Sequence, residues 1–126
     1  MKARETALKL KRFEMDEKAR RLSDLEHMIR EFEAIASDLD RQIHAEEDRT
    51  GIKDPSHFAY STFAKSAAHR RDNLHSSISE LRGRLDVAQR DFDDAKQQLA
   101  RATSEEPQMD RSSRRRADRG AAFALR

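Results

Sequence analysis

The side chains best suited to chemistry in this chain are its histidines and carboxylates, and their spacing favours a solvated surface. The five histidines are His27, His44, His57, His69 and His75. No two of them lie three or four residues apart with a carboxylate placed to complete a metal site. Glu46, Glu47 and Asp48 form an acidic run, but paired carboxylates do acid–base work only inside a pocket. We therefore expect no catalytic residue, no metal, no cofactor and no enzyme activity.

Other signatures of catalysis and targeting are also missing from the sequence. There is no Gly-rich phosphate loop, no nucleophile elbow and no cysteine, which excludes a disulfide scaffold, a thiolate metal site and a thiol nucleophile. The sequence contains no run of about 18 apolar residues, so we expect no membrane span. No apolar stretch follows Lys2 and Arg4, so we expect no secretory signal.

Aromatic and basic side chains cluster shortly after the middle of the chain. Phe58, Tyr60 and Phe63 stand close to Arg70 and Arg71. Exposed aromatics beside arginines are typical of protein-binding hot spots, so these five residues are the candidate partner-binding group. In the alternative reading the rings pack as a small apolar plug that closes a turn. The two readings are compatible, because one ring can pack while another stays exposed.

The elements that position these residues follow from composition and periodicity. Charged residues make up 40% of the chain and hydrophobic residues 36%, which suits one apolar seam better than a globular core. In the first half, heptad rows are Leu8, Met15, Leu22, Ile29, Ala36, Ile43 and Lys11, Lys18, Leu25, Phe32, Leu39, Glu46. In the second half they are Ile78, Leu85, Phe92, Leu99 and Leu74, Leu81, Ala88, Ala95, Ala102. Rows repeating at 3–4 spacing over several heptads predict a coiled coil.

Turn signals separate the two halves. Gly51 can adopt the left-handed conformation that ends a helix, Asp54 can cap the next helix, and Pro55 suits its first turn. We predict an all-α fold, an antiparallel two-helix coiled-coil hairpin with a flexible C-terminal tail. The hairpin occupies residues 1–106, with a helix at about 4–49, a turn at 50–56 and a helix at about 57–104, and the basic flexible tail occupies 107–126.

The two seams also predict a register. Pairing Leu25 with Leu85 and Ile29 with Leu81 folds the chain about residue 55, inside the predicted turn. A register shifted by a few residues would also centre in this loop, so the exact register stays open. Lys11 and Lys18 interrupt the seam and predict a weaker end there.

The last twenty residues differ in charge from the rest. Residues 1–106 carry 20 Lys or Arg and 22 Asp or Glu, whereas residues 107–126 carry six arginines and two aspartates. Pro107 is expected to end the second helix. The run Arg114–Arg116 supports an alternative function, in which the arginine-rich tail binds nucleic acid or another acidic surface. No aromatics are interleaved for base stacking, so nucleic acid is not the first choice.

Two stretches resemble the FliJ family of flagellar export proteins, in its α-proteobacterial branch. The first is Lys9-Leu10-Lys11-Arg12-Phe13 with Asp16-Glu17-Lys18. The second, which is the specific part, is Thr50-Gly51-Ile52-Lys53-Asp54-Pro55-Ser56-His57-Phe58-Ala59-Tyr60, continuing through Thr62-Phe63-Ala64-Lys65 to Arg70-Arg71-Asp72-Asn73-Leu74. The similarity covers roughly residues 2–104.

The resemblance implies a stalk-like coiled coil of the flagellar type III export apparatus, cytoplasmic and peripheral at the inner face of the membrane at the flagellar base. Implied partners are the export ATPase, FliI, the export gate protein, FlhA, and export chaperones, with no small-molecule substrate. By analogy with a stalk, Lys9, Lys11 and Arg12 are predicted to face the ATPase ring. Phe58, Tyr60, Phe63, Arg70 and Arg71 are predicted to face the gate.

Overall fold

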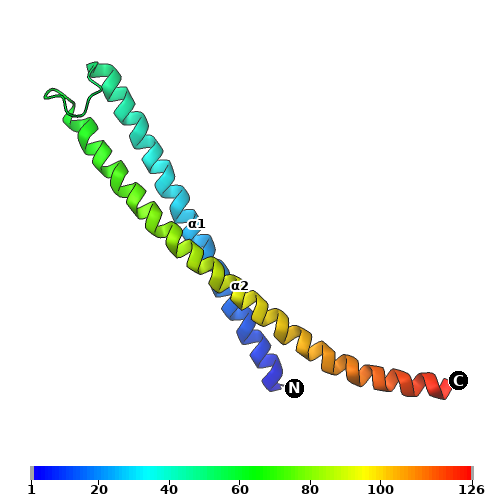
Figure 1. Ribbon diagram of the computed structural model, residues 1–126. Helices are drawn as coiled ribbons and strands as arrows, with labels where there is room; N and C mark the ends of the chain where they lie inside the picture. The colour runs from blue at the N-terminus through cyan, green and yellow to red at the C-terminus, as the bar shows by residue number, and fades with distance from the viewer. Residues whose placement is uncertain (1, 126) are drawn as a thin grey trace. The chain divides into compact units, whose positions relative to one another are not determined.

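The computed structural model describes the backbone of residues 2–125 and the side chains of residues 2–104, and its regular structure there is entirely helical. Helix α1 spans Lys2–Thr50 and helix α2 spans Thr62–Leu125 (Figure 1). Residues Arg21–Ala88 form one compact unit, and Met1–Arg20 with Gln89–Arg126 form another. Within the described residues, neither helix contains a stretch long and apolar enough to cross a membrane.

The Arg21–Ala88 unit is an antiparallel hairpin, which confirms the predicted fold class. Its two helices lie side by side (Figure 1), and their buried side chains form two clusters, which contain predicted seam residues and in addition Ala64 and Ala67. The cluster farther from the loop contains Leu25, Ile29, Ile78, Leu81 and Ala88, with Leu22, Phe32 and Leu85 packed against it. The cluster nearer the loop contains Leu39, Ile43, Ala64 and Ala67, with Tyr60, Ala68 and Leu74 packed against it. Removing this apolar surface from water is what holds the two helices together.

Ion pairs between the helices agree with the predicted register. Arg71 Nη1 lies 2.9 Å from Asp40 Oδ1, and Arg82 Nη2 lies 2.8 Å from Glu33 Oε1. The midpoint of each pair along the sequence lies within about three residues of Pro55, the predicted centre of the fold-back. Long arginine side chains can bridge an offset of this size between the two helices. These pairs, like the core clusters, place the fold-back in the loop that the turn residues predicted.

The second helix begins later than its predicted start at about residue 57. Asp54 does not cap α2, because residues 51–61 form an irregular loop and the cap is Ser61. Ser61 Oγ accepts a hydrogen bond from the backbone N–H of Ala64 at 3.2 Å, which satisfies one of the free donors in the first turn. Phe58 and Tyr60 therefore belong to the loop, and Phe63 alone of the three aromatics lies in α2.

The unit formed by Met1–Arg20 and Gln89–Arg126 has a thinner apolar seam. Leu8, Met15, Phe92 and Leu99 are half-buried, and no described side chain of this unit is fully buried. Lys11 is half-buried at a seam position, so a charged side chain stands where the heptad row would otherwise place an apolar one. The lysines thus coincide with the less buried unit, as the interrupted heptad row predicted.

The backbone of α2 continues beyond the predicted helix end at about residue 104, through Pro107 to Leu125. Proline removes one backbone donor, but the neighbouring residues are mostly Arg, Ala, Glu and Gln, which are strong helix formers. The side chains of the predicted basic tail, 107–126, lie outside the described residues. Its flexibility and its nucleic-acid alternative therefore stay predictions.

Candidate protein-binding surfaces

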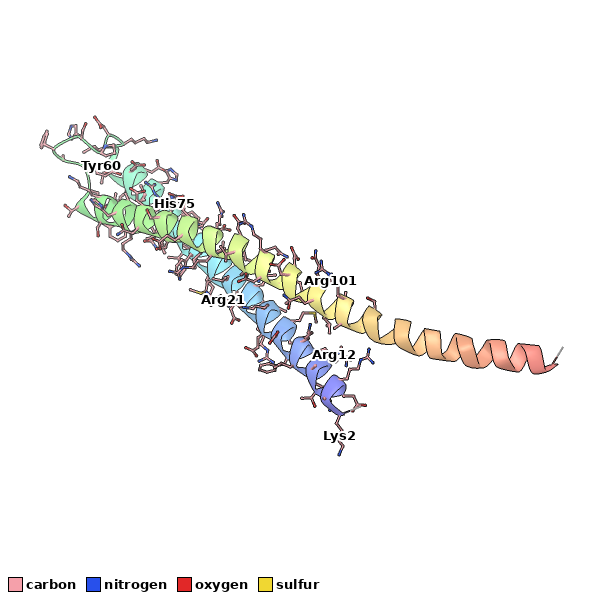
Figure 2. All side chains as sticks on the ribbon, turned by 60° about the horizontal axis from the view of Figure 1, so that its bottom comes forward. Lys2, Arg12, Arg21, Tyr60, His75 and Arg101 are labelled. Carbon is pink, nitrogen blue, oxygen red and sulfur yellow. The ribbon has the colours of Figure 1, made fainter. Side chains whose placement is uncertain are left out.

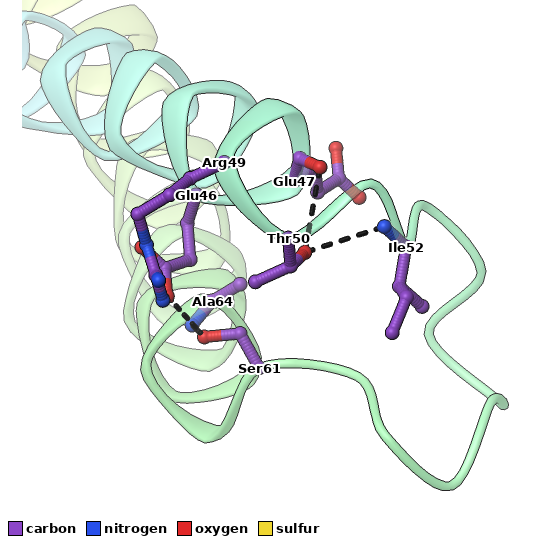
Figure 3. A network of polar contacts seen from close by, with 7 residues as sticks. All are labelled: Glu46, Glu47, Arg49, Thr50, Ile52, Ser61 and Ala64. Atoms are coloured by element: carbon purple, nitrogen blue, oxygen red, sulfur yellow. Dashed lines mark hydrogen bonds and ion pairs between the residues drawn. The ribbon is translucent and has the colours of Figure 1, made fainter.

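The loop between the helices starts with a glycine that ends α1. Gly51 has a φ of 74°, in the left-handed region that costs an L-residue with a Cβ atom. Its N–H donates to the carbonyl oxygen of Glu47 at 2.8 Å. Thr50 Oγ1 donates to the same carbonyl at 3.4 Å and accepts from the N–H of Ile52 at 3.3 Å (Figure 3). The end of α1 is thus satisfied locally, and the chain leaves the helix in one defined direction.

Asp54 organises the middle of the loop instead of capping a helix. Its Oδ1 accepts from Ser56 Oγ at 2.7 Å and from the Ser56 N–H at 2.9 Å, and its carbonyl accepts from the His57 N–H at 3.0 Å. These bonds, that from the Ser56 hydroxyl first, lower the pKa of Asp54, because they favour the ionised carboxylate. The next turn is held by His57 Nδ1, which accepts from the Ala59 N–H at 3.0 Å. The loop is therefore an ordered turn held by its own side chains.

The acidic run at the end of α1 ties the loop to the hairpin. Glu46 Oε1 accepts from Ser61 Oγ at 2.9 Å, and Glu46 also pairs with Arg49 (Figure 3). The hydrogen bond from Arg49, followed by that from Ser61, lowers the pKa of Glu46. Glu47 Oε2 accepts from the Tyr60 hydroxyl at 2.9 Å. Burial of the Tyr60 ring, and then this hydrogen bond, raises the pKa of Tyr60. These carboxylates tie the loop and the start of α2 to the end of α1.

The five predicted gate-facing residues have different surroundings. Tyr60, at the loop end of the hairpin (Figure 2), is half-buried and packs against the cluster near the loop. Arg71 is bound to Asp40, whose hydrogen bond raises the pKa of the Arg71 guanidinium. Phe58 is 96% exposed and its ring stacks on His57, with ring centroids 4.7 Å apart. Phe63 and Arg70 are also exposed. Tyr60 therefore packs as the plug reading predicted, Phe58 faces solvent, and partner binding by this group stays a prediction.

The residues predicted to face the ATPase lie in the first turns of α1. Lys9 and Arg12 are exposed, and Lys11 is half-buried. Leu10 and Phe13 on the same segment are 56% and 58% exposed, and the sequence analysis did not include them in a site. Leu10 and Phe13 are three residues apart, so they lie on one side of the helix, and neither belongs to a seam row. That pattern could have indicated a second apolar surface from the sequence.

Sequence reasoning also missed an exposed apolar pair beside the seam of the hairpin. Met28 and Ile35 are 40% and 42% exposed, and they lie one heptad apart, flanking the row that contains Phe32. Scoring the positions next to the seam, as well as the seam itself, would have shown them.

Among the described residues, no group of three or more His, Asp or Glu side chains is placed to hold a metal ion. Comparison with protein-family models, with curated proteins and with solved structures finds no match to this chain.

Proposed function

We propose that this chain is a stalk-like coiled-coil component of the flagellar type III export apparatus. In this role it acts by binding proteins and links the export ATPase ring, FliI, to the membrane export gate, FlhA, with export chaperones as further partners. Its location is then the cytoplasmic face of the cell membrane at the flagellar base. The observation that carries the proposal is the FliJ-like stretch from Thr50 to Leu74, which spans the loop and the start of α2.

The surroundings of that stretch support a binding role. It forms an ordered loop with an exposed phenylalanine at its tip, on a hairpin whose core is filled by its own seam. An exposed aromatic ring presented by a rigid element can enter a partner's pocket at small entropic cost. Within the proposal, Phe58, Phe63 and Arg70 are the contacts offered to the gate, while Tyr60 and Arg71 hold the tip in shape.

The ATPase end of the proposal is tested by charge reversal. Lys9→Glu with Arg12→Glu changes two exposed cations and leaves the half-buried Lys11 in place. We expect this variant to lose co-purification with the export ATPase and to keep binding to the gate protein. Arg30→Glu with Lys65→Glu, at two other exposed cations, is the matched control. Selective loss of gate binding would show that the orientation is reversed.

The gate end is tested at the loop. Phe58→Ala removes a side chain that is 96% exposed, so the fold is expected to be unchanged and gate binding to weaken at least tenfold. Val87→Ala, at an exposed apolar side chain of the same hairpin, is the control. If neither the full chain nor a version ending at residue 106 binds an assembled ATPase ring or the gate, the export role is excluded. Binding by the full chain alone, lost steeply with salt, would favour the arginine-rich tail as the functional element.

A further inference from the structure

The two long faces of the Arg21–Ala88 hairpin differ in how their side chains are used. On one face, Arg82 reaches across the seam to Glu33, and a groove of about 410 Å³ there is lined by the same two residues with Ala36, His75, Ile78 and Ser79. On the opposite face, the heptad positions next to the seam include Met28 and Ile35 of α1 and Phe63, Arg70, Ser77 and Arg84 of α2. We call this second set the open face.

The open face combines apolar side chains with cationic ones that form no ion pair within residues 2–104. Met28, Ile35 and Phe63 are 40%, 42% and 55% exposed. Arg70 and Arg84 are exposed and make no ion pair with any side chain among residues 2–104, whereas Arg71 and Arg82 both pair across the seam. Exposed apolar side chains next to free cations form a surface that an acidic, amphipathic partner would complement.

A groove runs along this face. It has a volume of about 320 Å³ and is lined by Phe32, Ile35, Arg70, Asn73, Leu74 and Ser77. Phe32 and Ile35 form its apolar wall on α1, and the α2 wall is polar except for Leu74. A helix laid into a groove between two helices packs its apolar ridge in this way and completes a three-helix arrangement.

The spacing of the open-face residues defines the partner more closely. Met28 and Ile35 are one heptad apart, about 10 Å along a helix, and Arg70 and Arg84 are two heptads apart, about 21 Å. We propose that the open face binds one amphipathic helix of a partner protein. That helix has apolar residues at heptad spacing for Met28 and Ile35 and carboxylates two heptads apart for Arg70 and Arg84. This inference does not depend on the export role.

A second copy of this chain fits the open face less well. If two hairpins met with their axes parallel, Met28 and Ile35 would lie against the arginines of the second copy. If they met with their axes antiparallel, the apolar pairs would meet, but Arg70 would lie near Arg84 of the second copy. Like charges brought together at a desolvated contact are destabilising, so the free arginines favour an acidic partner.

The test uses the full chain and two synthetic helical peptides of about 21 residues, stapled on the outer face so that both are helical. Both carry leucines at heptad spacing, and they differ only in having glutamates or lysines at two positions fourteen residues apart. We expect the glutamate peptide to bind at least tenfold tighter in fluorescence anisotropy at low salt, and this preference to shrink as salt is added.

Three variants locate the binding on the open face. Ile35→Gln is expected to weaken the glutamate peptide about tenfold, while Phe13→Gln, at an exposed apolar side chain outside the Arg21–Ala88 hairpin, changes its affinity less than twofold. Arg70→Glu with Arg84→Glu is expected to reverse the preference toward the lysine peptide. Far-ultraviolet circular dichroism checks that each variant keeps its helix content.

Several outcomes would overturn the proposal. Equal affinity for the two peptides would show that the arginines select nothing, and no binding of the glutamate peptide at about 100 µM would show that the groove is not a docking site. A preference left unreversed by the double arginine variant would place the binding elsewhere. A dimer in sedimentation equilibrium that dissociates on Ile35→Gln would make a second copy the occupant of the face.

Discussion

The substitution Gly83→Ala isolates the intrinsic helix preference of one position in the hairpin. Gly83 lies inside α2, and a Cβ atom added there meets nothing within 4 Å, so no packing contact is gained or lost. The remaining effect is backbone entropy, since glycine loses more freedom than alanine on entering a helix. We expect a stabilisation of about 0.5–1 kcal/mol, or a rise of about 2–4 °C in the melting temperature for a chain of this size.

Urea unfolding followed by circular dichroism at 222 nm measures this change, and Gly51→Ala is its matched control of opposite sign. A Cβ atom at Gly51 also meets nothing within 4 Å, but φ there is 74°, so alanine is strained and the hairpin should lose about 1 kcal/mol. The same substitution in equally open space thus changes stability in opposite directions. If Gly83→Ala left the midpoint unchanged or lowered it, α2 would not be a regular helix at that position and the reasoning would fail.

Three further predictions concern the core, the helix cap and the tip. Leu39→Ala, at a buried side chain, should cost about 2–4 kcal/mol in urea unfolding and Leu99→Ala, at a half-buried one, clearly less; equal costs would contradict the difference in burial. Ser61→Ala should cost at least about 1 kcal/mol, because the Ser61 hydroxyl both caps α2 and donates to Glu46, and Ser61→Thr, which keeps a hydroxyl, should keep most of the stability; an equal loss in both variants would exclude these hydrogen bonds as the cause. The pKa of Tyr60 is raised in the folded chain, so the stability that this group contributes is present below the unfolded pKa of about 10 and lost as the pH rises through the folded value. Tyr60→Phe should remove that alkaline loss in melting experiments, and an identical pH profile in both proteins would refute the assignment.

The start of α2 shows where local sequence signals were insufficient. Asp54 and Pro55 form a good helix-start signal, yet Asp54 bonds to Ser56 and the helix begins only after Ser61. Both Asp54 and Ser61 are suitable caps when read alone. Ser61 has the additional hydrogen bond to Glu46, and Tyr60 the bond to Glu47, and these contacts connect residues more than ten positions apart. No local pattern contains that information.

The candidate site was predicted as a cluster, and the structure divides it. Phe58, Tyr60 and Phe63 are similar in type and close in sequence, so spacing could not tell which ring packs. Tyr60 reaches the core because its hydroxyl can bond to Glu47 while its ring packs against the buried cluster near the loop. Phe58 has no polar atom to satisfy and stacks on His57 in solvent. Likewise, Arg70 and Arg71 are adjacent in sequence, but only Arg71 points toward Asp40.

The sequence by itself determined the helical class, the apolar seam and the position of the fold-back, because a heptad repeat and a left-handed glycine act over a few neighbouring residues. The tertiary structure alone decided which helix cap is used, which aromatic ring is packed and which arginines pair across the seam within residues 2–104. It also decided that one face of the hairpin is bridged by ion pairs while the other exposes Met28 and Ile35. Those outcomes depend on which side chains of α2 come level with which side chains of α1. That depends on the register of packing, which is a property of both helices together.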